Sequence, residues 1–161
     1  MKKKIEIIRT FPDAILKIKT KNVKEISDSV VKILEQMVEV IKMVEGAGLA
    51  ANQIGIDKSF AIALLENGKF LRIINPIIKE YDGEEIDTEG CLSIPDAVVK
   101  VSRATRIVIE YLDIDENIKT FEASGFTARV LQHEIDHLKG TLIIDKLKPD
   151  ERLKFLREYK K

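Results

Sequence analysis

The sequence contains no tryptophan, one cysteine and two histidines in 161 residues. A lone cysteine, Cys91, excludes an intramolecular disulfide, which fits a reducing compartment. Positive and negative side chains number 27 each, so the formal net charge of zero gives no indication of a DNA or membrane partner. No apolar run is long enough to span a bilayer, and Glu6, Arg9 and Asp13 interrupt any apolar region of a signal peptide. We therefore expect a cytoplasmic protein.

The length and composition are typical of one globular domain. A chain of 161 residues is long enough to bury its own core, and 45% hydrophobic residues is an ordinary content for a folded protein. No repeat, low-complexity tract or Pro/Gly-rich linker divides the sequence. We expect a single domain over residues 1–161.

Residues 23–45 have the pattern of a long amphipathic helix. Apolar side chains recur at intervals of three and four residues, which places them on one face of a helix. Asn22 and Glu25 have the spacing of a capping box at its start. The expected apolar stripe consists of Ile26, Val30, Ile33, Leu34, Met37, Val38 and Ile41.

Four short apolar segments predict two β-hairpins. They are residues 59–65 and 69–74, joined at Asn67-Gly68, and residues 106–112 and 118–123. Gly125 then precedes a helical segment that runs to about Leu138 and ends before Gly140. This order of elements predicts an α+β fold, with mostly antiparallel sheets around a central metal-binding helix and a long N-terminal helix.

Both histidines lie in the segment Gln132-His133-Glu134-Ile135-Asp136-His137. Positions i and i+4 share one face of a helix, so both imidazoles can reach one metal ion. Glu134 then lies close enough to take a proton from metal-bound water, which is the chemistry of H-E-x-x-H metallohydrolases. The alternative is an exposed helix that carries two histidines by chance.

A catalytic site of this kind usually has a third protein ligand. The third histidine of the metzincin pattern is replaced by Ile143, and Glu151 and Glu158 lie in a charged tail with the pattern of an exposed helix face. A zincin-type endopeptidase therefore lacks its usual third ligand. Cys91 is a candidate because thiolates bind Zn²⁺ and Fe²⁺. The alternative, which composition alone allows equally, is that Cys91 is simply a small side chain buried in the core.

A third segment completes a recognisable set of motifs. Residues 46–53 read Gly-Ala-Gly-Leu-Ala-Ala-Asn-Gln, residues 89–93 read Glu-Gly-Cys-Leu-Ser, and residues 132–138 read Gln-His-Glu-Ile-Asp-His-Leu. In this order they match the patterns G-x-G-L-A-A-x-Q, E-G-C-L-S and Q-H-E-x-D-H-L of peptide deformylases. The sequence therefore resembles that family, and the resemblance extends loosely from Phe11 to Asp145.

The resemblance implies a metal site and a general base. Cys91, His133 and His137 would hold the metal, with Fe²⁺ the usual ion of the family and Zn²⁺, Ni²⁺ or Co²⁺ able to substitute. Glu134 would deprotonate the metal-bound water and later protonate the leaving amine. The expected reaction is hydrolysis of the N-terminal formyl group of formyl-methionyl nascent peptides, with release of formate.

The resemblance also assigns binding roles. The Gln53 side chain and the Leu92 backbone N–H would donate to the formyl oxygen as it gains charge. Backbone groups would pair with the extended substrate in the manner of a strand. These groups belong to Ala47, Gly48 and Gly90.

Further residues would support the ligands without binding the metal. Glu89 and Arg103 would form an ion pair that steadies the cysteine loop, and Gln132 and Asp136 would support the helix. Val98 departs from the family, because many members have a basic residue at this position.

The basic tail is a candidate contact for the ribosome, which family members are thought to reach through a C-terminal helix. Its cationic residues are Lys146, Lys148, Arg152, Lys154, Arg157, Lys160 and Lys161. The alternative is an exposed helix that packs on the domain. In a different class, a deformylase-like protein could bind metal and peptide without turnover.

Overall fold

The structure is a computed structural model and describes residues 7–159. Glu6 in the signal-peptide argument and Lys160 and Lys161 of the basic tail lie outside these residues. Within them, no helix combines the length and apolar character that crossing a membrane requires. The elements in chain order are η1 (Ala14–Lys17), α2 (Asp28–Val44), β1 (Gly48–Ala50), η2 (Ala51–Ile54), β2 (Phe60–Leu64), β3 (Phe70–Asp82), β4 (Glu85–Cys91), β5 (Ile94–Arg103), β6 (Arg106–Leu112), β7 (Ile118–Ser124), α3 (Gly125–Leu138), η3 (Ile143–Lys146) and α4 (Pro149–Glu158).

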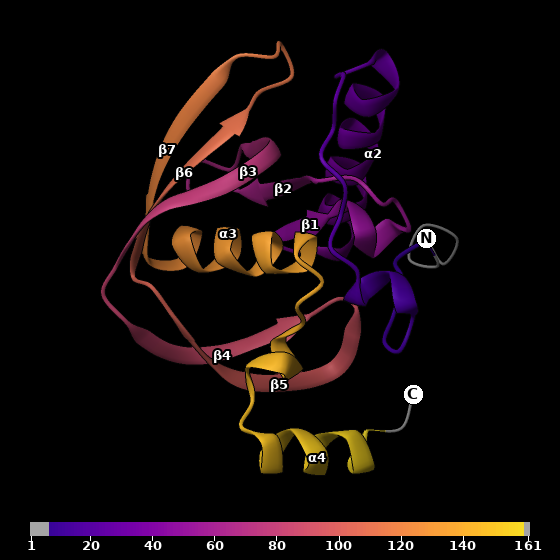
Figure 1. Cartoon of the computed structure of the whole chain (residues 1–161), viewed down its shortest axis with the longest axis vertical. Coiled ribbons are helices and arrows are strands. Elements are labelled where there is room, and N and C mark those ends of the chain that lie inside the picture. Colours follow the sequence, from indigo (N-terminus) through magenta and orange to yellow (C-terminus); the bar gives the residue numbers. More distant parts are fainter. Residues whose placement is uncertain (1–6, 160–161) are drawn as a thin grey trace.

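The strands form two antiparallel sheets. One has five strands in the order β1-β2-β3-β6-β7, and the other pairs β4 with β5. Helix α3 lies between the five-stranded sheet and the β4–β5 pair, and α4 lies beyond that pair (Figure 1). The expected α+β class with antiparallel sheets is therefore confirmed.

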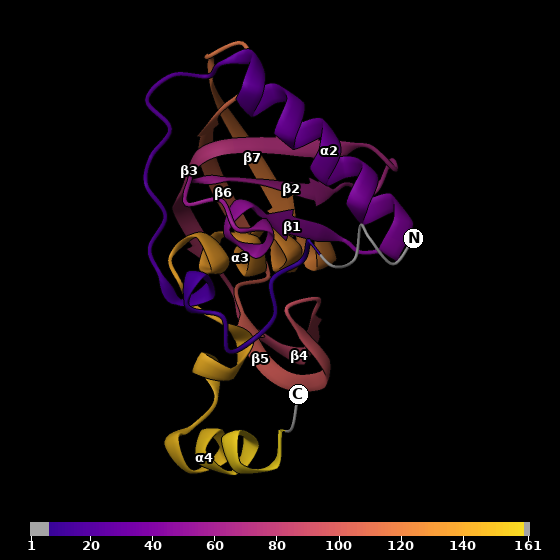
Figure 2. The same cartoon turned by 90° about the vertical axis from the view of Figure 1, so that its right-hand side faces the viewer.

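Helices α2 and α3 cover opposite faces of the five-stranded sheet, and Figure 2 shows α2 crossing in front of its strands. Successive residues of a strand face opposite sides. In β2, Phe60 and Ile62 accordingly pack with α2, whereas Ala61 and Ala63 pack with α3. The small alanine side chains let α3, the helix with both histidines, lie close to the sheet.

The start of α2 differs from the expected capping box. The helix begins at Asp28, and the Ser27 hydroxyl accepts a hydrogen bond from the Val30 N–H at 3.4 Å. Val23 is held outside the helix because the Asn75 side chain bonds both its N–H, at 2.8 Å, and its carbonyl, at 2.9 Å. The capping box at Asn22 was therefore wrong, since a partner distant in sequence satisfies this part of the backbone.

Both predicted hairpins are confirmed, although the first was predicted too short. Strand β3 continues to Asp82 instead of ending at residue 74, and its pairing with β6 shifts between Ile74 and Ile77. Pro76 lies within this shift, where its missing N–H does not interrupt a regular ladder. The second hairpin matches its prediction to within one residue, at Ser124.

The β4–β5 pair was not predicted, and it positions the cysteine. Strand β4 reads Glu-Ile-Asp-Thr-Glu-Gly-Cys and is mostly exposed, so it lacks the apolar run on which the other strands were predicted. Strand β5 alternates between buried and exposed residues, and Arg103 at its end points inward with the buried set. Cys91 at the end of β4 thereby comes to face α3.

Helix α3 ends where the chain passes close to another segment. Gly140 has a φ of +76°, and a Cβ atom there would lie 2.6 Å from the Lys17 carbonyl oxygen. Only glycine fits this position. The turn at Gly140 thus fixes the C-terminal end of the helix that carries His133 and His137.

Candidate metal centre

Cys91, His133 and His137 come together at one point between β4 and α3. Their ligand atoms all lie within 4.8 Å of one another. The two Nε2 atoms are 3.1 Å apart, and Cys91 Sγ lies 3.3 Å from His137 Nε2. Three atoms that converge in this way leave space for one ion between them.

The other proposed third ligands do not join this group. Among residues 7–159, Cys91, His133 and His137 are the one set of three or more potential ligands that converge. Glu151 and Glu158 are exposed on α4, and the Ile143 side chain is buried in the apolar cluster under β5. The thiolate is the third candidate ligand that the geometry supports.

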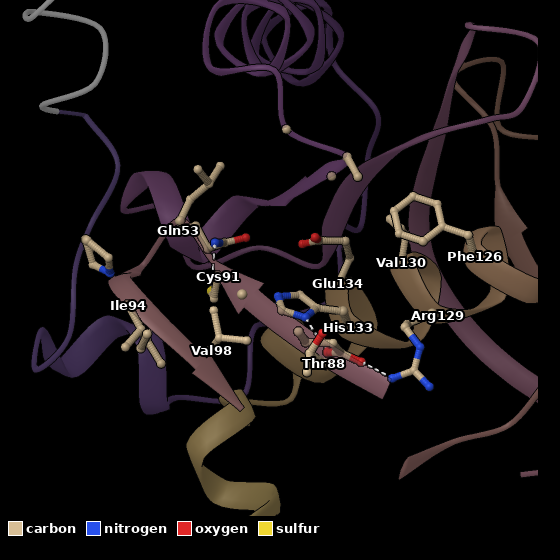
Figure 3. A pocket seen from close by; sticks show the side chains of 18 of the residues that line it. Gln53, Thr88, Cys91, Ile94, Val98, Phe126, Arg129, Val130, His133 and Glu134 are labelled. Carbon is tan, nitrogen blue, oxygen red and sulfur yellow. Dashed lines mark hydrogen bonds and ion pairs between the residues drawn. The ribbon is translucent and has the colours of Figure 1, made fainter. Parts of the chain in front are cut away.

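The donor atoms of the site suit a divalent transition metal. Burial, together with the charge of His133, lowers the pKa of His137 well below its usual value, which favours the neutral imidazole that binds metals. A set of one sulfur and two nitrogen donors is typical of zinc and iron sites. Glu134 and Gln53 lie at the edge of the cluster (Figure 3).

Glu134 is a buried carboxylate with an unused oxygen. Its Oε2 atom has no hydrogen-bond partner among the described residues, and burial raises the pKa of Glu134 to about 7. A Cβ atom on Gly48 would lie 2.7 Å from Glu134 Oε1, so glycine at position 48 makes room for this carboxylate. The arrangement suits a general base near neutral pH.

A buried ion-pair network lies behind His133. Glu89 accepts from His133 Nδ1 and from Arg103 Nη2 at Oε1, and from Arg103 Nε at Oε2, each at 2.9 Å. Arg103 also bonds Asp136 on α3. Burial alone would raise the pKa of Glu89, but the bonds from Arg103 and His133 hold it well below its usual range. Glu89 therefore stays ionised and fixes the His133 ring.

Gln132 joins α3 to the end of the β5 strand. Its side-chain oxygen accepts from the Ala104 N–H at 3.0 Å, and its nitrogen donates to the Ala104 carbonyl at 2.9 Å and to the Ala128 carbonyl at 3.0 Å. Each of the residues expected to support the ligands therefore makes hydrogen bonds or ion pairs around them. These residues are Glu89, Arg103, Gln132 and Asp136.

Arg129 belongs to the same network and was not predicted. Its Nη1 atom donates to Glu89 Oε2 at 2.7 Å and to the Val101 carbonyl at 2.9 Å, and its Nη2 atom donates to the Glu85 carbonyl at 2.8 Å. The available signal was its spacing, because a residue four positions before His133 lies on the same helical face.

Gln53 lies on the opposite side of the cluster. Its Oε1 atom accepts from the Ala50 N–H at 2.9 Å, and its Nε2 atom lies 3.1 Å from Ser93 Oγ and 3.8 Å from Cys91 Sγ. The amide nitrogen thus points at the sulfur that would bind the metal. Its carbonyl oxygen is used by the backbone, which fixes the orientation of the amide group.

Gln53, Glu134, Cys91 and His133 share a cavity of about 700 Å³. Figure 3 shows Glu134 and Gln53 pointing toward one another across the space above Cys91 and His133. Apolar side chains make up much of the remaining wall. The predicted site residues that line the cavity are Ala47, Gly48, Gln53, Gly90, Cys91, Leu92, His133 and Glu134.

The fold and the cluster together define an α+β metallohydrolase with a candidate Cys-His-His metal site. Residues 5–153 match the polypeptide deformylase family. The peptide deformylase of Dictyoglomus thermophilum is 44% identical over 142 residues, which cover 88% of this chain and 92% of that protein.

Solved structures agree with this match. The crystal structure of peptide deformylase from Thermotoga maritima superposes with a TM-score of 0.85 at 39% identity, over 88% of this chain and 97% of that one. A peptide deformylase from Synechococcus elongatus in complex with actinonin gives a TM-score of 0.85 at 34% identity, over 91% and 82% of the two chains. The chain belongs to the polypeptide deformylase family. Its activity is the metal-dependent hydrolysis of the formyl group at the N-terminus of formylated peptides.

Proposed function

We propose that this site deformylates formyl-methionyl nascent peptides through Glu134, Gln53 and the Leu92 backbone. The observation that carries the proposal is the buried Glu134 carboxylate across the cavity from the Gln53 amide, with one oxygen that has no hydrogen-bond partner within residues 7–159. The cavity of about 700 Å³ beside these two groups is large enough for a water molecule and a small formamide. The family match supports the same reaction.

Cys91, His133 and His137 would hold the metal, which supplies a Lewis acid and lowers the pKa of a bound water. Glu134 accepts the proton of the attacking water and returns it to the leaving amine. The Gln53 side chain and the Leu92 N–H donate hydrogen bonds to the formyl oxygen as it becomes negative. Proton transfer and charge stabilisation thus come from opposite walls of the cavity.

The peptide would bind beside β1, one of the two edge strands of the five-stranded sheet. An edge strand has backbone groups available for an extended peptide, and Ala47 and Gly48 line the cavity there. Gly90 lies on the facing wall, where the absence of a side chain allows close approach of the substrate. The apolar part of the cavity, which includes Val130, would receive the methionine side chain.

Release of formate from a formyl-methionyl tripeptide tests the proposal directly. The metal-loaded protein should produce formate and a free methionyl amine, and should not cleave the internal peptide bonds. A protein that binds the peptide without releasing formate would be the non-catalytic alternative. Internal cleavage without formate release would instead indicate an endopeptidase.

We propose Fe²⁺ as the native ion. Sulfur from Cys91 and two imidazole nitrogens suit Fe²⁺ as well as Zn²⁺, Ni²⁺ or Co²⁺. A thiolate–iron site that oxygen can reach is sensitive to air because the sulfur and the iron can both be oxidised. Protein purified without oxygen should contain iron and lose activity in air, whereas the nickel form should resist. Cys91→Ser should weaken metal binding, and normal binding by this variant would remove Cys91 from the ligand set.

A role at the ribosome, in the cytoplasm, is a further part of the proposal. Leu153 and Leu156 are exposed on α4 among basic side chains, while Tyr159 at its end is half-buried against Phe11 and Phe155. One side of α4 is therefore free for a polyanionic partner such as ribosomal RNA. Removal of residues 150–161 should abolish salt-sensitive co-sedimentation with ribosomes. Unchanged co-sedimentation would leave α4 as a helix that only packs on the domain.

A further inference from the structure

Arg129 connects the helix that carries the histidines to both strands of the pair that carries the cysteine. It lies on α3 one turn before His133, and its side chain is 10% exposed. Its guanidinium reaches the Glu85 carbonyl and the Glu89 carboxylate on β4, and the Val101 carbonyl on β5. One planar group thus binds three acceptors on two strands.

This connection matters because the metal ligands come from two separate bodies. Cys91 belongs to the β4–β5 pair, which shares no ladder with the five-stranded sheet. His133 and His137 belong to α3, which packs on that larger sheet. The distance between the sulfur and the imidazoles therefore depends on the contacts that hold the strand pair against the helix.

Neutralising the charge of Glu89 does not by itself explain why Arg129 binds this carboxylate in addition to Arg103. Arg103 already binds both oxygens of this carboxylate at 2.9 Å, which compensates its negative charge. A further guanidinium on Oε2 withdraws electron density from the carboxylate and so weakens it as an acceptor for His133 Nδ1. The two backbone carbonyls that Arg129 binds carry no net charge, so these bonds act on geometry.

We propose that Arg129 is a positioning residue of the metal centre. It sets the distance between Cys91 and the two histidines by fixing the strand pair to α3, and it adjusts His133 through Glu89. The inference rests on the metal site proposed above. A merely structural Arg129 would change the stability of the fold and leave the bound metal unaltered, so the two roles have different consequences.

Cobalt substitution provides a readout that a structural role would not change. The Co²⁺ form of the unmodified protein should show a thiolate charge-transfer band and ligand-field bands that report the geometry at the ion. Arg129→Lys and Arg129→Gln should shift the ligand-field bands and accelerate release of Co²⁺ to a chelator by about 10-fold, the lower end of the effect on metal affinity of losing a direct partner of a metal ligand.

The lysine variant separates geometry from charge. Lysine keeps the positive charge but lacks the planar fork that reaches several acceptors at once. We expect Arg129→Lys to behave like Arg129→Gln, and it remains decisive if the glutamine variant fails to fold. Arg106→Lys and Arg106→Gln are matched controls, because Arg106 also binds several acidic side chains but lies on the outer surface, on β6. Their cobalt spectra should equal that of the unmodified protein.

Two results would overturn the inference. One is an Arg129→Lys protein with unaltered bands and release rate, whatever its thermal stability. The other is equal shifts in the Arg106 controls, which would show that the cobalt bands report general loosening. A missing thiolate band in the unmodified protein would contradict the metal site itself, so failure of the proposed function is distinguishable from failure of this inference.

Discussion

Arg103 and Arg106 lie three positions apart in the chain, and each binds several carboxylates in very different surroundings. The Arg103 side chain is 4% exposed, and its partner Glu89 is 6% exposed. The Arg106 side chain is 33% exposed, and its partners are about 60% exposed. The first set joins β5 to α3 behind the metal site. The partners of Arg106 lie on the exposed surface of the five-stranded sheet and are Glu80, Asp82 and Glu122.

The comparison shows that the surroundings decide what an ion pair contributes. Exposed pairs are screened by water and salt, so they contribute little to stability. Buried charges cost free energy to desolvate, and the loss of one partner leaves the other uncompensated. The Arg103 set therefore specifies where β4–β5 meets α3 more than it adds stability. Because this set lies beside His133, the place where β4–β5 meets α3 also determines how Cys91 lies relative to the two histidines.

The largest expected effect concerns Glu134, a buried carboxylate beside the candidate metal site. Glu134→Ala should lower turnover by about 10²–10⁴-fold, because a general base contributes that much. The free energy of unfolding of the metal-free protein should stay equal or rise, since Glu134 Oε2 is buried without a partner in residues 7–159. Formate release and urea unfolding measure the two quantities.

Glu134→Gln is the matched control, because it keeps the volume and removes the base. Both variants should bind metal, since Glu134 is not among the converging ligand atoms. Near-normal turnover in either metal-loaded variant would remove Glu134 from the mechanism.

The sequence predicted the candidate site better than the elements that assemble it. His133, Glu134 and His137 follow from spacing on one helix, a local property. Cys91 required the family pattern, because nothing local indicates that residue 91 meets α3. Strand β4 is mostly polar, so it lacks the apolar pattern from which a strand is predicted. It is held instead by its pairing with β5 and by the buried ion pairs of Glu89. Arg129 was missed because an arginine in a helix is common unless its acceptors are known.

The start of α2 and the end of β3 differ from the sequence prediction because they depend on contacts with residues distant in sequence. The N-terminal end of α2 is set by Ser27, but the extended backbone before it is held by Asn75, more than fifty residues away. The continuation of β3 beyond Pro76 depends on its pairing with β6. Periodicity within a segment predicts neither partner, since both belong to other parts of the chain.

Arg103→Gln tests the buried side of the comparison. We expect the free energy of unfolding to fall by about 3–5 kcal/mol, because Glu89 and Asp136 lose their common partner. Urea unfolding at neutral pH measures this change. A loss below about 1 kcal/mol would show that water reaches this interface and that its burial is not decisive.

The acid dependence of this variant sharpens the same test. The folded pKa of Glu89 lies below its unfolded value of about 4.3, so its contribution to stability is present above that pH and is lost as the pH falls through the folded pKa. In Arg103→Gln the folded pKa of Glu89 should move back toward the unfolded value. Stability should then fall less steeply below about pH 4 than in the unmodified protein.

Gln53→Ala tests the role of the hydrogen-bond donor on the cavity wall opposite Glu134. Loss of one donor to a developing oxyanion typically lowers kcat by about 10²–10³-fold. The Ser93 hydroxyl and the Ala50 N–H also lose a partner, so a modest loss of stability should accompany the change. Steady-state kinetics with a formyl-methionyl tripeptide measure kcat and KM. A change confined to KM would make Gln53 a residue that binds the ground state.

The smallest expected effect is on the exposed side of the comparison. Arg106→Gln should change the midpoint of thermal unfolding by less than about 2 °C, because each partner it leaves behind stays solvated. The difference should shrink further in high salt, which screens exposed charges. Differential scanning calorimetry at low and high salt measures both effects, and formate release should be unaltered. Destabilisation as large as that of Arg103→Gln would mean that the number of partners outweighs burial, and the distinction between the two arginines would then fail.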